Sequence, residues 1–407
     1  MKDVTNFNPR RVRRYKYRIY PSADQQQILH QTMGCTRAIY NTVLYMNQQI
    51  YKNRNLYPDV KMIRLAEACR ILTHKSNDPK TPWFKEVSTD ALQQSLRDLD
   101  QAITHGFTVK GRRLPVFKKK GAEMSCRYPV RGKNQLQDLS TGYIKLPKLG
   151  KVAIKLHREL PGPFKSATVI KEANEWHVSL TVELSNAPRL KAITKSSVIG
   201  MDLGLKDLGI LSTGYKIPTL DPDHLLKLET KLANRQRVLA RKSKQSNSWY
   251  RAKTLVQKSY LKIKRFRSHY LHQVSNYLVS LGKHLVVEDL NIPKMLKTGY
   301  LAKRISDSGW GSLLNILQYK LRDQGLRLLK THPLFASSKT CSACQCKNHT
   351  LTLQHRSWMC QSCNTEHDRD VNAATNLVNR ALNRIKGSVK YKDLQGIVYL
   401  DMAYNAR

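Results

Sequence analysis

The sequence predicts a multidomain α+β protein, and three observations support this fold class. Apolar residues recur at helical spacing from about residue 22 to residue 107, whereas the period-two alternation of half-buried strands dominates the stretch that follows. Further on, carboxylates stand at the ends of short apolar strands, and two Cys-x-x-Cys pairs lie near the C-terminus. With 407 residues the chain is long enough for about two to three domains.

Each predicted element has its own pattern. A basic, aromatic strand is predicted at Arg11–Tyr20, and the helical module after it has apolar positions such as Leu92, Leu96 and Leu99. From Trp176 to Leu184 apolar and polar residues alternate, as a strand with one buried face requires. The first predicted domain is a β domain at 1–21 and 108–190, and a helical module at 22–107 splits it. The second predicted domain lies at 191–335 and 364–387, and a cysteine-rich insertion at 336–363 splits it. A C-terminal tail at 388–407 is predicted to follow.

The charge of the chain predicts a polyanionic partner. Its 71 Lys and Arg residues against 29 Asp and Glu residues give a formal net charge of +42 and a pI near 10.1. Nucleic acid is the usual partner of so basic a protein, because each neutralised phosphate releases a counterion. Two long helices predicted between about 223 and 280 have Lys and Arg beside an apolar stripe. This favours phosphate contact, a solvated basic face being the alternative.

Composition argues against a membrane or secreted protein. Hydrophobic residues make up 41% of the chain, and no run approaches the ~18 apolar residues that cross a bilayer, so we expect no membrane partner. The basic N-terminus has no apolar stretch behind it and does not resemble a secretory signal. We therefore expect a protein that acts inside the cell.

The cysteine spacing predicts a zinc site. Eight cysteines divide into three scattered ones and five clustered ones, Cys341, Cys344, Cys346, Cys360 and Cys363. The pairs Cys341-x-x-Cys344 and Cys360-x-x-Cys363 are separated by fifteen residues, which is typical of a tetrahedral four-thiolate zinc ribbon, a redox arrangement being the alternative. Four thiolates leave no open ligand position, so the zinc is expected to be structural and Cys346 to be a spare thiol.

Three carboxylates indicate a second kind of metal site. Asp202 follows the apolar strand Val198–Met201, Glu288 ends the strand His284–Val287, and Asp370 lies where a polar segment leads into a helix. Hydrolysis of a phosphodiester needs charge stabilisation on the attacking and leaving oxygens, which two Mg²⁺ ions held by carboxylates provide. Each signal is weak alone, because a strand-terminal Asp is often a turn former and the segment around Glu288 also suits a strand end with a helix cap.

In their order along the chain, these motifs resemble those of the TnpB (OrfB) family of insertion sequences, the relatives of compact type V CRISPR effectors. The resemblance covers nearly the whole chain. The first, second and third RuvC motifs of the family are matched by Ile199–Asp207, Val287–Leu290 and His367–Ala374. Ser337–Cys344 and the second cysteine pair match the zinc ribbon. Three further segments are also similar to the family: Ile305–Trp310, Arg18–Pro21 and Arg37–Asn41.

The resemblance implies a fold and an activity. The second domain would be an RNase H-like RuvC nuclease with the zinc ribbon inserted, and the β domain would be a β-barrel-like wedge domain split by a helical recognition lobe. The protein would be an RNA-guided DNA endonuclease. It would pair a guide RNA from the transposon end with double-stranded target DNA beside a short adjacent motif, displace a single strand, and act as a monomeric ribonucleoprotein.

The resemblance also implies roles for single residues. Asp202, Glu288 and Asp370 would be the catalytic residues and hold two Mg²⁺ ions, whereas Asp368 is expected at a helix start. The four cysteines of the two pairs would hold Zn²⁺.

Two positions in the helical module are candidate readers of the adjacent motif. Gln93 would read a base through its amide, because its segment resembles the family's region near that motif, and Tyr57 is a second candidate for the same role. The sequence also departs from the family at one point. Gln345 and Cys346 follow the first cysteine pair, where the family usually has glycine, and this affects the expected shape of the zinc-binding turn.

Other functions stay open. A guide-loaded DNA-binding protein or transposition accessory that does not cut would share the basic surface, and only the three carboxylates distinguish a nuclease from it. Their presence argues against the nuclease-dead repressor relatives of the family. A eukaryotic Fanzor-type relative would share the chemistry but act in the nucleus, whereas a prokaryotic protein would be cytoplasmic and nucleoid-associated. Arg10–Lys16 suits either nuclear import or phosphate contact.

Overall fold

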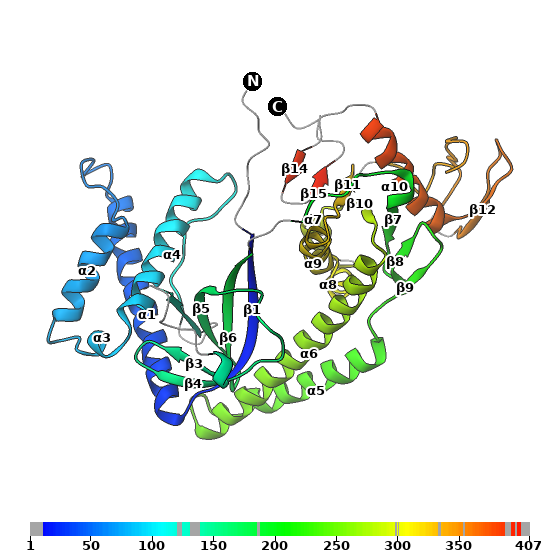
Figure 1. The fold of residues 1–407 in the computed structure, drawn as a ribbon. Helices are drawn as coiled ribbons and strands as arrows, with labels where there is room; N and C mark the ends of the chain where they lie inside the picture. The colour runs from blue at the N-terminus through cyan, green and yellow to red at the C-terminus, as the bar shows by residue number, and fades with distance from the viewer. Residues whose placement is uncertain are drawn as a thin grey trace. The chain divides into compact units, whose positions relative to one another are not determined.

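The computed structural model forms two compact units, drawn in Figure 1, with unit 1 ending at Ser185 and unit 2 beginning at Asn186. None of the helices in the described part of the chain is long and apolar enough to cross a membrane. The described residues are 11–119, 124–130, 139–184, 188–297, 299, 301–332, 335–352, 355–386, 392–394 and 397–399.

Unit 1 is built on an antiparallel sheet. Its strands are β1 (Arg11–Tyr20), β2 (Met124–Pro129), β3 (Tyr143–Leu146), β4 (Gly150–Lys155), β5 (Phe164–Glu172) and β6 (Glu175–Leu184), with a short 3-10 turn η2 at Leu139–Thr141. Their order is β2-β5-β6-β1-β4-β3. Val178, Leu180 and Val182 of β6 are buried, while Ser179 and Thr181 between them are partly exposed, which confirms the predicted alternation for this part of the strand. His177, which the pattern assigns to the polar face, is buried as well.

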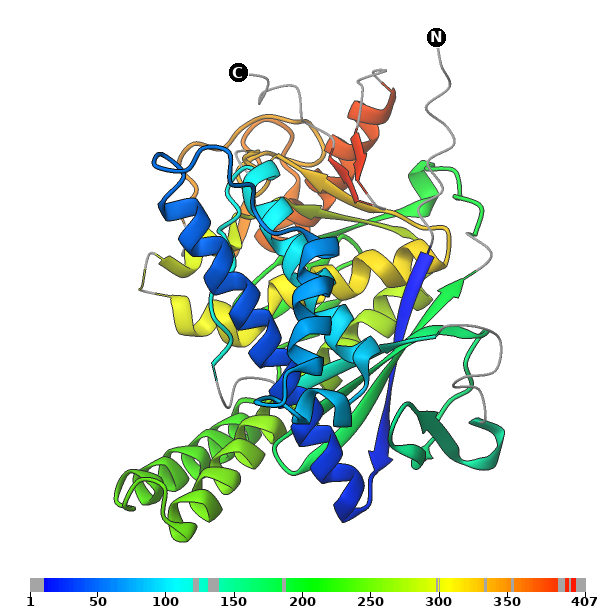
Figure 2. The ribbon, with the colours of Figure 1, turned by 90° about the vertical axis from the view of Figure 1, so that its left-hand side faces the viewer.

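The helical module of unit 1 packs against this sheet. Its helices are α1 (Ala23–Lys52), α2 (Leu65–Asn77), α3 (Trp83–Glu86) and α4 (Thr89–Thr108). α1 begins at a capping box, in which Ser22 and Gln25 each hydrogen-bond the other's backbone N–H. Leu29 and Met33 of α1 and Ala91 of α4 are buried in the core of the sheet, and Figure 2 shows α1 in dark blue from the side.

Unit 2 is built on a mixed sheet. Its strands are β7 (Val198–Leu203), β8 (Asp207–Leu211), β9 (Lys216–Pro218), β10 (His284–Glu288), β11 (Leu328–Thr331), β14 (Lys392–Leu394) and β15 (Ile397–Tyr399), preceded by the 3-10 turn η3 at Lys195–Ser197. In the described residues their order is β14-β15-β11-β10-β7-β8-β9. The pairs among β7, β10, β11 and β15 are parallel, and the remaining pairs are antiparallel. The predicted strands before Asp202 and Glu288 are therefore confirmed, and they are direct neighbours.

Helices pack on both faces of this sheet. The helices of unit 2 are α5 (Pro222–Ala240), α6 (Asn247–Ser280), α7 (Ile292–Lys297), α8 (Ala302–Ser308), α9 (Trp310–Asp323) and α10 (Arg369–Lys386). Of these, α5 packs against α6, where Leu225 and Leu228 form a separate small core with Ile263. Side chains alternate along β7. Ile199 and Met201 belong to a core with α6 and α9, whereas Val198 belongs to a core with Leu377 and Ala381 of α10.

The C-terminal hairpin extends this sheet. β14 and β15 lie in the segment 388–407, which the sequence predicts as a tail, and β15 pairs in parallel with β11. The rest of that segment lies outside the described residues. A part of the predicted tail thus belongs to the sheet of unit 2.

Candidate metal-binding sites

The carboxylates Asp202 and Glu288 lie on adjacent parallel strands. β10 pairs with β7 in a register that sets Val286 opposite Gly200. Continuing this register by two residues brings Glu288 beside Asp202, where both strands reach their carboxyl ends, and both residues are half-buried. The carboxyl edge of parallel strands is the place where open α/β sheets bind ligands.

Burial and mutual repulsion perturb both acids. Burial, assisted by the negative charge of Asp370, raises the pKa of Asp202 to about 7, against the opposing effects of Arg369 and of the backbone N–H of Leu203. Burial and the charge of Asp202 raise the pKa of Glu288 to about 7. A cation bound between such acids would offset both the burial of charge and the repulsion, so the pair is suited to a metal ion.

Helix α10 carries the third acid in its first turn. The helix lies so close to β7 that a Cβ at Gly200 would stand 2.0 Å from the carbonyl oxygen of Ala374. Asp368 precedes the helix, and its Oδ1 accepts hydrogen bonds from the backbone N–H groups of Asp370 at 2.9 Å and of Val371 at 3.1 Å. Asp368 is therefore the helix cap that the sequence predicts.

Two arginines contact Asp370. Arg356 Nη1 donates to Asp370 Oδ2 at 3.2 Å, and Arg369 Nε lies 3.5 Å from Asp370 Oδ1. Arg356 belongs to the cysteine-rich insertion and directly precedes β12 (Ser357–Met359), so the insertion reaches this acid. The local pattern around Arg356 contains no signal of the contact, because it depends on how the insertion folds back.

Asp202 is electrostatically coupled to both other acids, Asp370 and Glu288. The three carboxylates do not close on a single point. Among the described residues, the four paired cysteines are the one group of three or more His, Cys, Asp or Glu side chains whose ligand atoms all lie within 4.8 Å of one another. Asp370 pairs with the two arginines instead. The donor chemistry nevertheless fits Mg²⁺, because three carboxylates on rigid elements provide the hard oxygen ligands that this ion prefers.

The sulfur atoms of the four paired cysteines lie close enough together to bind one metal ion. Cys341 Sγ lies 3.6 Å from Cys363 Sγ, and Cys344 Sγ lies 3.5 Å from Cys360 Sγ. Zinc–sulfur bonds of about 2.3 Å in a tetrahedron place the sulfur atoms about 3.8 Å apart, so the cluster fits Zn²⁺. The antiparallel pair of β12 and β13 (Glu366–Asp368) flanks the second cysteine pair.

Each cysteine pair is followed by a residue in the left-handed region. Gln345 has a φ of 66°, and Asn364 has a φ of 52°. Gln345 stands where the resembling family usually has glycine, and its side-chain amide donates to the carbonyl oxygens of Cys341 and Ser342, both at 3.3 Å. The turn therefore keeps the conformation that glycine adopts easily, and these hydrogen bonds offset part of the strain.

The two predicted base readers lie in unit 1. Gln93 is half-buried on α4, and Tyr57 is exposed in the segment after α1. The neighbouring Gln94 lines a polar cavity of about 250 Å³. Sequence alone does not separate Gln93 from Gln94, although adjacent helix positions point about 100° apart. The charged side chains that line this cavity are those of Arg14, Asp98, Lys118 and Arg127.

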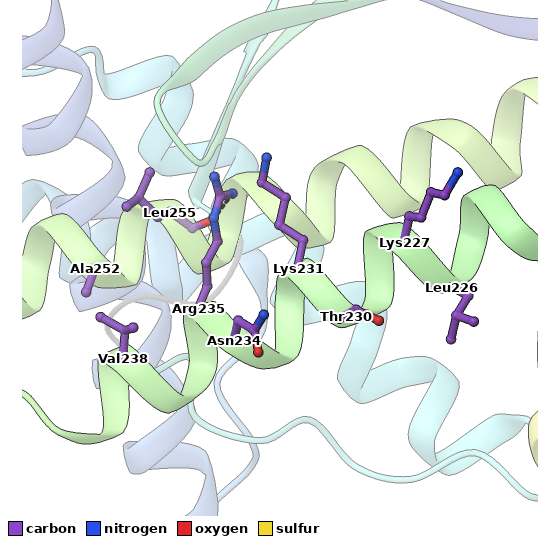
Figure 3. A pocket seen from close by; sticks show the side chains of 9 residues that line it. All are labelled: Leu226, Lys227, Thr230, Lys231, Asn234, Arg235, Val238, Ala252 and Leu255. Atoms are coloured by element: carbon purple, nitrogen blue, oxygen red, sulfur yellow. Dashed lines mark hydrogen bonds between the residues drawn. The ribbon is translucent and has the colours of Figure 1, made fainter.

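Another cavity, of about 600 Å³, lies between α5 and α6 of unit 2 (Figure 3). Its lining is mostly apolar, and Figure 3 shows Lys227 and Lys231 directed to the same side of α5. Arg235 Nη1 joins the two helices by donating to Ser259 Oγ at 2.7 Å and to the carbonyl oxygen of Leu255 at 3.1 Å. This is the basic helix pair for which the sequence favours phosphate contact.

Family models match three parts of the chain. A model of the OrfB group, described as "Probable transposase", matches residues 178–299. A model described as the Cas12f1-like TNB domain matches residues 310–377, which include the four paired cysteines and Asp370. A model described as a helix-turn-helix domain matches residues 11–55. In the structure, that last segment contains β1 followed by the long helix α1.

Relatives of known name match almost the full length. A protein of Streptomyces pristinaespiralis that is named as an RNA-guided DNA endonuclease is 33% identical over 371 residues, which cover 90% of this chain and 88% of the relative. InsQ of Escherichia coli strain K12, with the same description, is 28% identical and covers 91% of this chain and 92% of its own. A solved Cas12f1-sgRNA-target DNA complex aligns over 91% of this chain and 99% of its own, with 14% identity and a TM-score of 0.47.

Proposed function

Because the chain belongs to the TnpB (OrfB) family of RNA-guided DNA endonucleases, we propose that it is a metal-dependent enzyme that hydrolyses phosphodiester bonds of DNA chosen by a guide RNA. One structural observation carries the chemical part of this proposal. The parallel neighbours β7 and β10 carry acids at their carboxyl ends, and α10, packed on β7, brings a third acid whose charge acts on Asp202.

The proposed partners are a guide RNA from the transposon end, double-stranded target DNA and the strand that it displaces. The formal charge of +42 supports polyanionic partners. The basic side of the α5–α6 pair, with Lys227 and Lys231, is the proposed phosphate-binding surface of unit 2. We propose a monomeric ribonucleoprotein that cuts beside a short adjacent motif in a prokaryotic cell.

Asp202, Glu288 and Asp370 are the proposed catalytic residues and would hold two Mg²⁺ ions. When bound, such ions supply charge stabilisation to the attacking and leaving oxygens of the phosphodiester. Asp202 is the shared ligand in this assignment, since it interacts electrostatically with both other acids. Because the pKa values of Asp202 and Glu288 lie at about 7, protons compete with cations for these two side chains near neutral pH.

Arg356 has a proposed role beside the acids. It neutralises part of the charge of Asp370 and holds that carboxylate through a 3.2 Å hydrogen bond. Its side chain is 63% exposed, so the guanidinium group is also accessible to a phosphate of a bound strand. We propose that Arg356 contacts the cleaved strand.

The other parts take the places that the family resemblance implies. The sheet of unit 2 would be the RNase H-like RuvC domain, and the four paired cysteines would hold a structural Zn²⁺ in a ribbon inserted into it. The sheet of unit 1 would be the wedge domain, and α1 to α4 would be the recognition lobe. Gln93 and Tyr57 are the proposed readers of the adjacent motif, with the cavity at Gln94 as a further candidate surface.

One experiment separates this function from that of a guide-loaded DNA-binding protein. The protein is purified from its expressing cell, the co-purifying RNA is sequenced, and DNA matched to that RNA is incubated with and without Mg²⁺. We expect Mg²⁺-dependent cleavage by the wild-type protein and intact RNA and DNA binding without cleavage by Asp202→Ala. Binding without cleavage by the wild-type protein would identify a DNA-binding protein, and equal cleavage by the variant would remove Asp202 from the site.

A further inference from the structure

Three asparagines of α10 face the loop that carries the first cysteine pair. Asn372, Asn376 and Asn379 are separated by four and then three residues, which places them on one face of the helix. Asn372 is 2% exposed, and Asn376 is 0% exposed. The amides of Asn372 and Asn376 therefore contact protein and not solvent, while Asn379 is half-buried.

The amides bind the backbone on both sides of the first cysteine. The carbonyl oxygen of Thr340 accepts hydrogen bonds from Asn372 Nδ2 at 2.7 Å and from Asn376 Nδ2 at 2.6 Å. Ser342 donates its N–H to Asn372 Oδ1 at 2.8 Å, and its carbonyl oxygen accepts from Asn379 Nδ2 at 3.1 Å. Because a buried loop without regular structure must find partners for its backbone groups, α10 stabilises this one conformation of the loop.

The hydrogen bonding of Asn376 indicates that its donated hydrogen bonds, and not apolar burial, are what this position contributes. Its Nδ2 also donates to the carbonyl oxygen of Ser337 at 2.8 Å, whereas its Oδ1 is buried and has no hydrogen-bond partner among the described residues. A buried oxygen without a partner is unfavourable, and an apolar side chain would avoid it. What the amide contributes at this position is therefore its pair of donated bonds to the cysteine loop.

A second contact joins the same two parts. His367 lies on β13, directly before α10, and its Nε2 is 3.0 Å from Cys341 Sγ. Its ring centroid lies 4.9 Å from that of Trp358, and burial lowers the pKa of His367. The sulfur of the first cysteine is thus held from the side by a residue that leads into the helix.

The other face of α10 rests on the sheet. Asp370 and Ala374 are four residues apart and share that face, and a Cβ at Gly200 would stand 2.0 Å from the carbonyl oxygen of Ala374. The helix is therefore fixed between the sheet edge on one side and the cysteine loop on the other. Asp370 lies in the first turn of this helix, between the two contacts.

We propose that Asn372, Asn376 and Asn379, named here the asparagine clamp, are positioning residues that couple the zinc-closed cysteine loop to the place of Asp370. The clamp touches neither the DNA nor the reacting atoms. It makes the metal-closed loop a support for the acidic edge, so that loss of either the zinc or the clamp displaces Asp370 while the sheet stays folded. The Mg²⁺ part of this inference rests on the proposed nuclease function, whereas its zinc part does not.

The zinc part is tested by the rate of zinc release to a coloured chelator from the purified ribonucleoprotein. Asn379→Ala removes one half-buried bond, and Asn372→Ala leaves the N–H of Ser342 without its partner. Asn383→Ala is the matched control, because Asn383 is an exposed asparagine on the same helix. We expect the two clamp variants to release zinc about 10- to 100-fold faster than the control, because losing groups that orient metal ligands weakens metal binding by about this factor.

The catalytic part is tested by the Mg²⁺ concentration at half-maximal cleavage of guide-matched DNA. We expect it to rise about 10-fold in Asn379→Ala, with the rate recovering at high Mg²⁺ and guide RNA binding unchanged, whereas Asn383→Ala stays at the wild-type value. Folded clamp variants that release zinc like the control would overturn the clamp. Faster zinc release with an unchanged Mg²⁺ requirement would overturn the coupling to Asp370. If the wild-type ribonucleoprotein cuts no DNA, the proposed function fails, and zinc release still tests the clamp.

Discussion

Gly200 of β7 and Ala374 of α10 touch backbone to backbone. A side chain at position 200 would bring its Cβ to 2.0 Å from the carbonyl oxygen of Ala374 and to 2.9 Å from its carbonyl carbon, far inside any non-bonded contact. Gly200 lies two residues before Asp202, and Ala374 lies four residues after Asp370. This contact therefore determines how closely the helix brings its acid to the acid of the strand.

The first prediction follows from that contact. Gly200→Ala should force α10 away from the sheet, lower stability by about 1–3 kcal/mol as overpacking does, and reduce cleavage about 100-fold by misplacing Asp370. Thermal unfolding and a cleavage assay measure the two effects. Gly311→Ala is the control in the same unit, since its Cβ would meet only Ile292 Cδ1 at 3.8 Å, and it should keep wild-type cleavage. A Gly200→Ala protein that cuts like the control would remove this contact from the account.

The second prediction distinguishes two adjacent acids. Lys330 Nζ donates to Asp289 Oδ1 at 2.9 Å, so Asp289 is already neutralised by an ion pair, whereas Glu288 is coupled to Asp202. Glu288→Gln should therefore reduce cleavage to background while DNA binding persists. Asp289→Asn should keep most of the cleavage and show a lower Tm because the ion pair with Lys330 is lost. The reverse order of the two cleavage rates would show that the wrong acid has been assigned.

The third prediction concerns pH and stability. The pKa of Asp202 and that of Glu288 are raised to about 7, chiefly by burial, while unfolded carboxyl groups titrate near pH 4. Between about pH 4 and about pH 7 the folded protein holds protons that the unfolded chain has released, so these acids lower its stability as the pH rises through this window. Without divalent ions, the Tm of the Asp202→Asn/Glu288→Gln variant should exceed that of the wild-type protein above about pH 7, and the two should converge near pH 4.

The measurement is a series of thermal unfolding curves of both proteins across that pH range. Adding Mg²⁺ at high pH should raise the Tm of the wild-type protein and leave the double variant unchanged, because only the charged acids bind the ion. Parallel Tm curves for the wild-type protein and the double variant would contradict the raised pKa values.

The fourth prediction tests which cysteines hold metal. Cys360 belongs to the group of four sulfur atoms, whereas Cys346 is exposed, and its Sγ lies 3.3 Å from Ser362 Oγ. Cys360→Ser should lose the bound zinc and destabilise the insertion, since a structural zinc site contributes folding free energy directly. Cys346→Ser should retain one zinc per chain. Elemental analysis of the purified variants measures their zinc content. Zinc loss from Cys346→Ser would mean that Cys346 belongs to the ligand set.

Sequence patterns predicted the strands, which arise within one element, and the cysteine cluster, which has a characteristic spacing. An apolar run before each acid predicted the strands of Asp202 and Glu288, and the spacing of the cysteines predicted a cluster that the fold closes. Contacts between distant segments leave no such pattern. Arg356 reaches an acid fourteen residues away, and Asn379 reaches a carbonyl thirty-seven residues away, so neither partner could be inferred from its neighbours.

The place of the C-terminal strand β15 in the sheet also depends on a contact between distant segments. β15 is three residues long, which is too short for a periodic pattern, and its pairing with β11 is a tertiary contact between segments far apart in the chain. Its place in the sheet follows from the fold of unit 2 and not from local propensity.

The most direct test of whether Asp202, Glu288 and Asp370 bind the catalytic metal ions is a structure of the ribonucleoprotein with matched DNA. Mn²⁺ takes the place of Mg²⁺ in this structure because it scatters anomalously. We predict anomalous peaks within about 2.1 Å of carboxylate oxygens of Asp202, Glu288 and Asp370, with Asp370 turned from Arg356 toward the metal. Clear density for the bound DNA without a peak between these acids, and with Asp370 still paired to Arg356, would contradict the nuclease account.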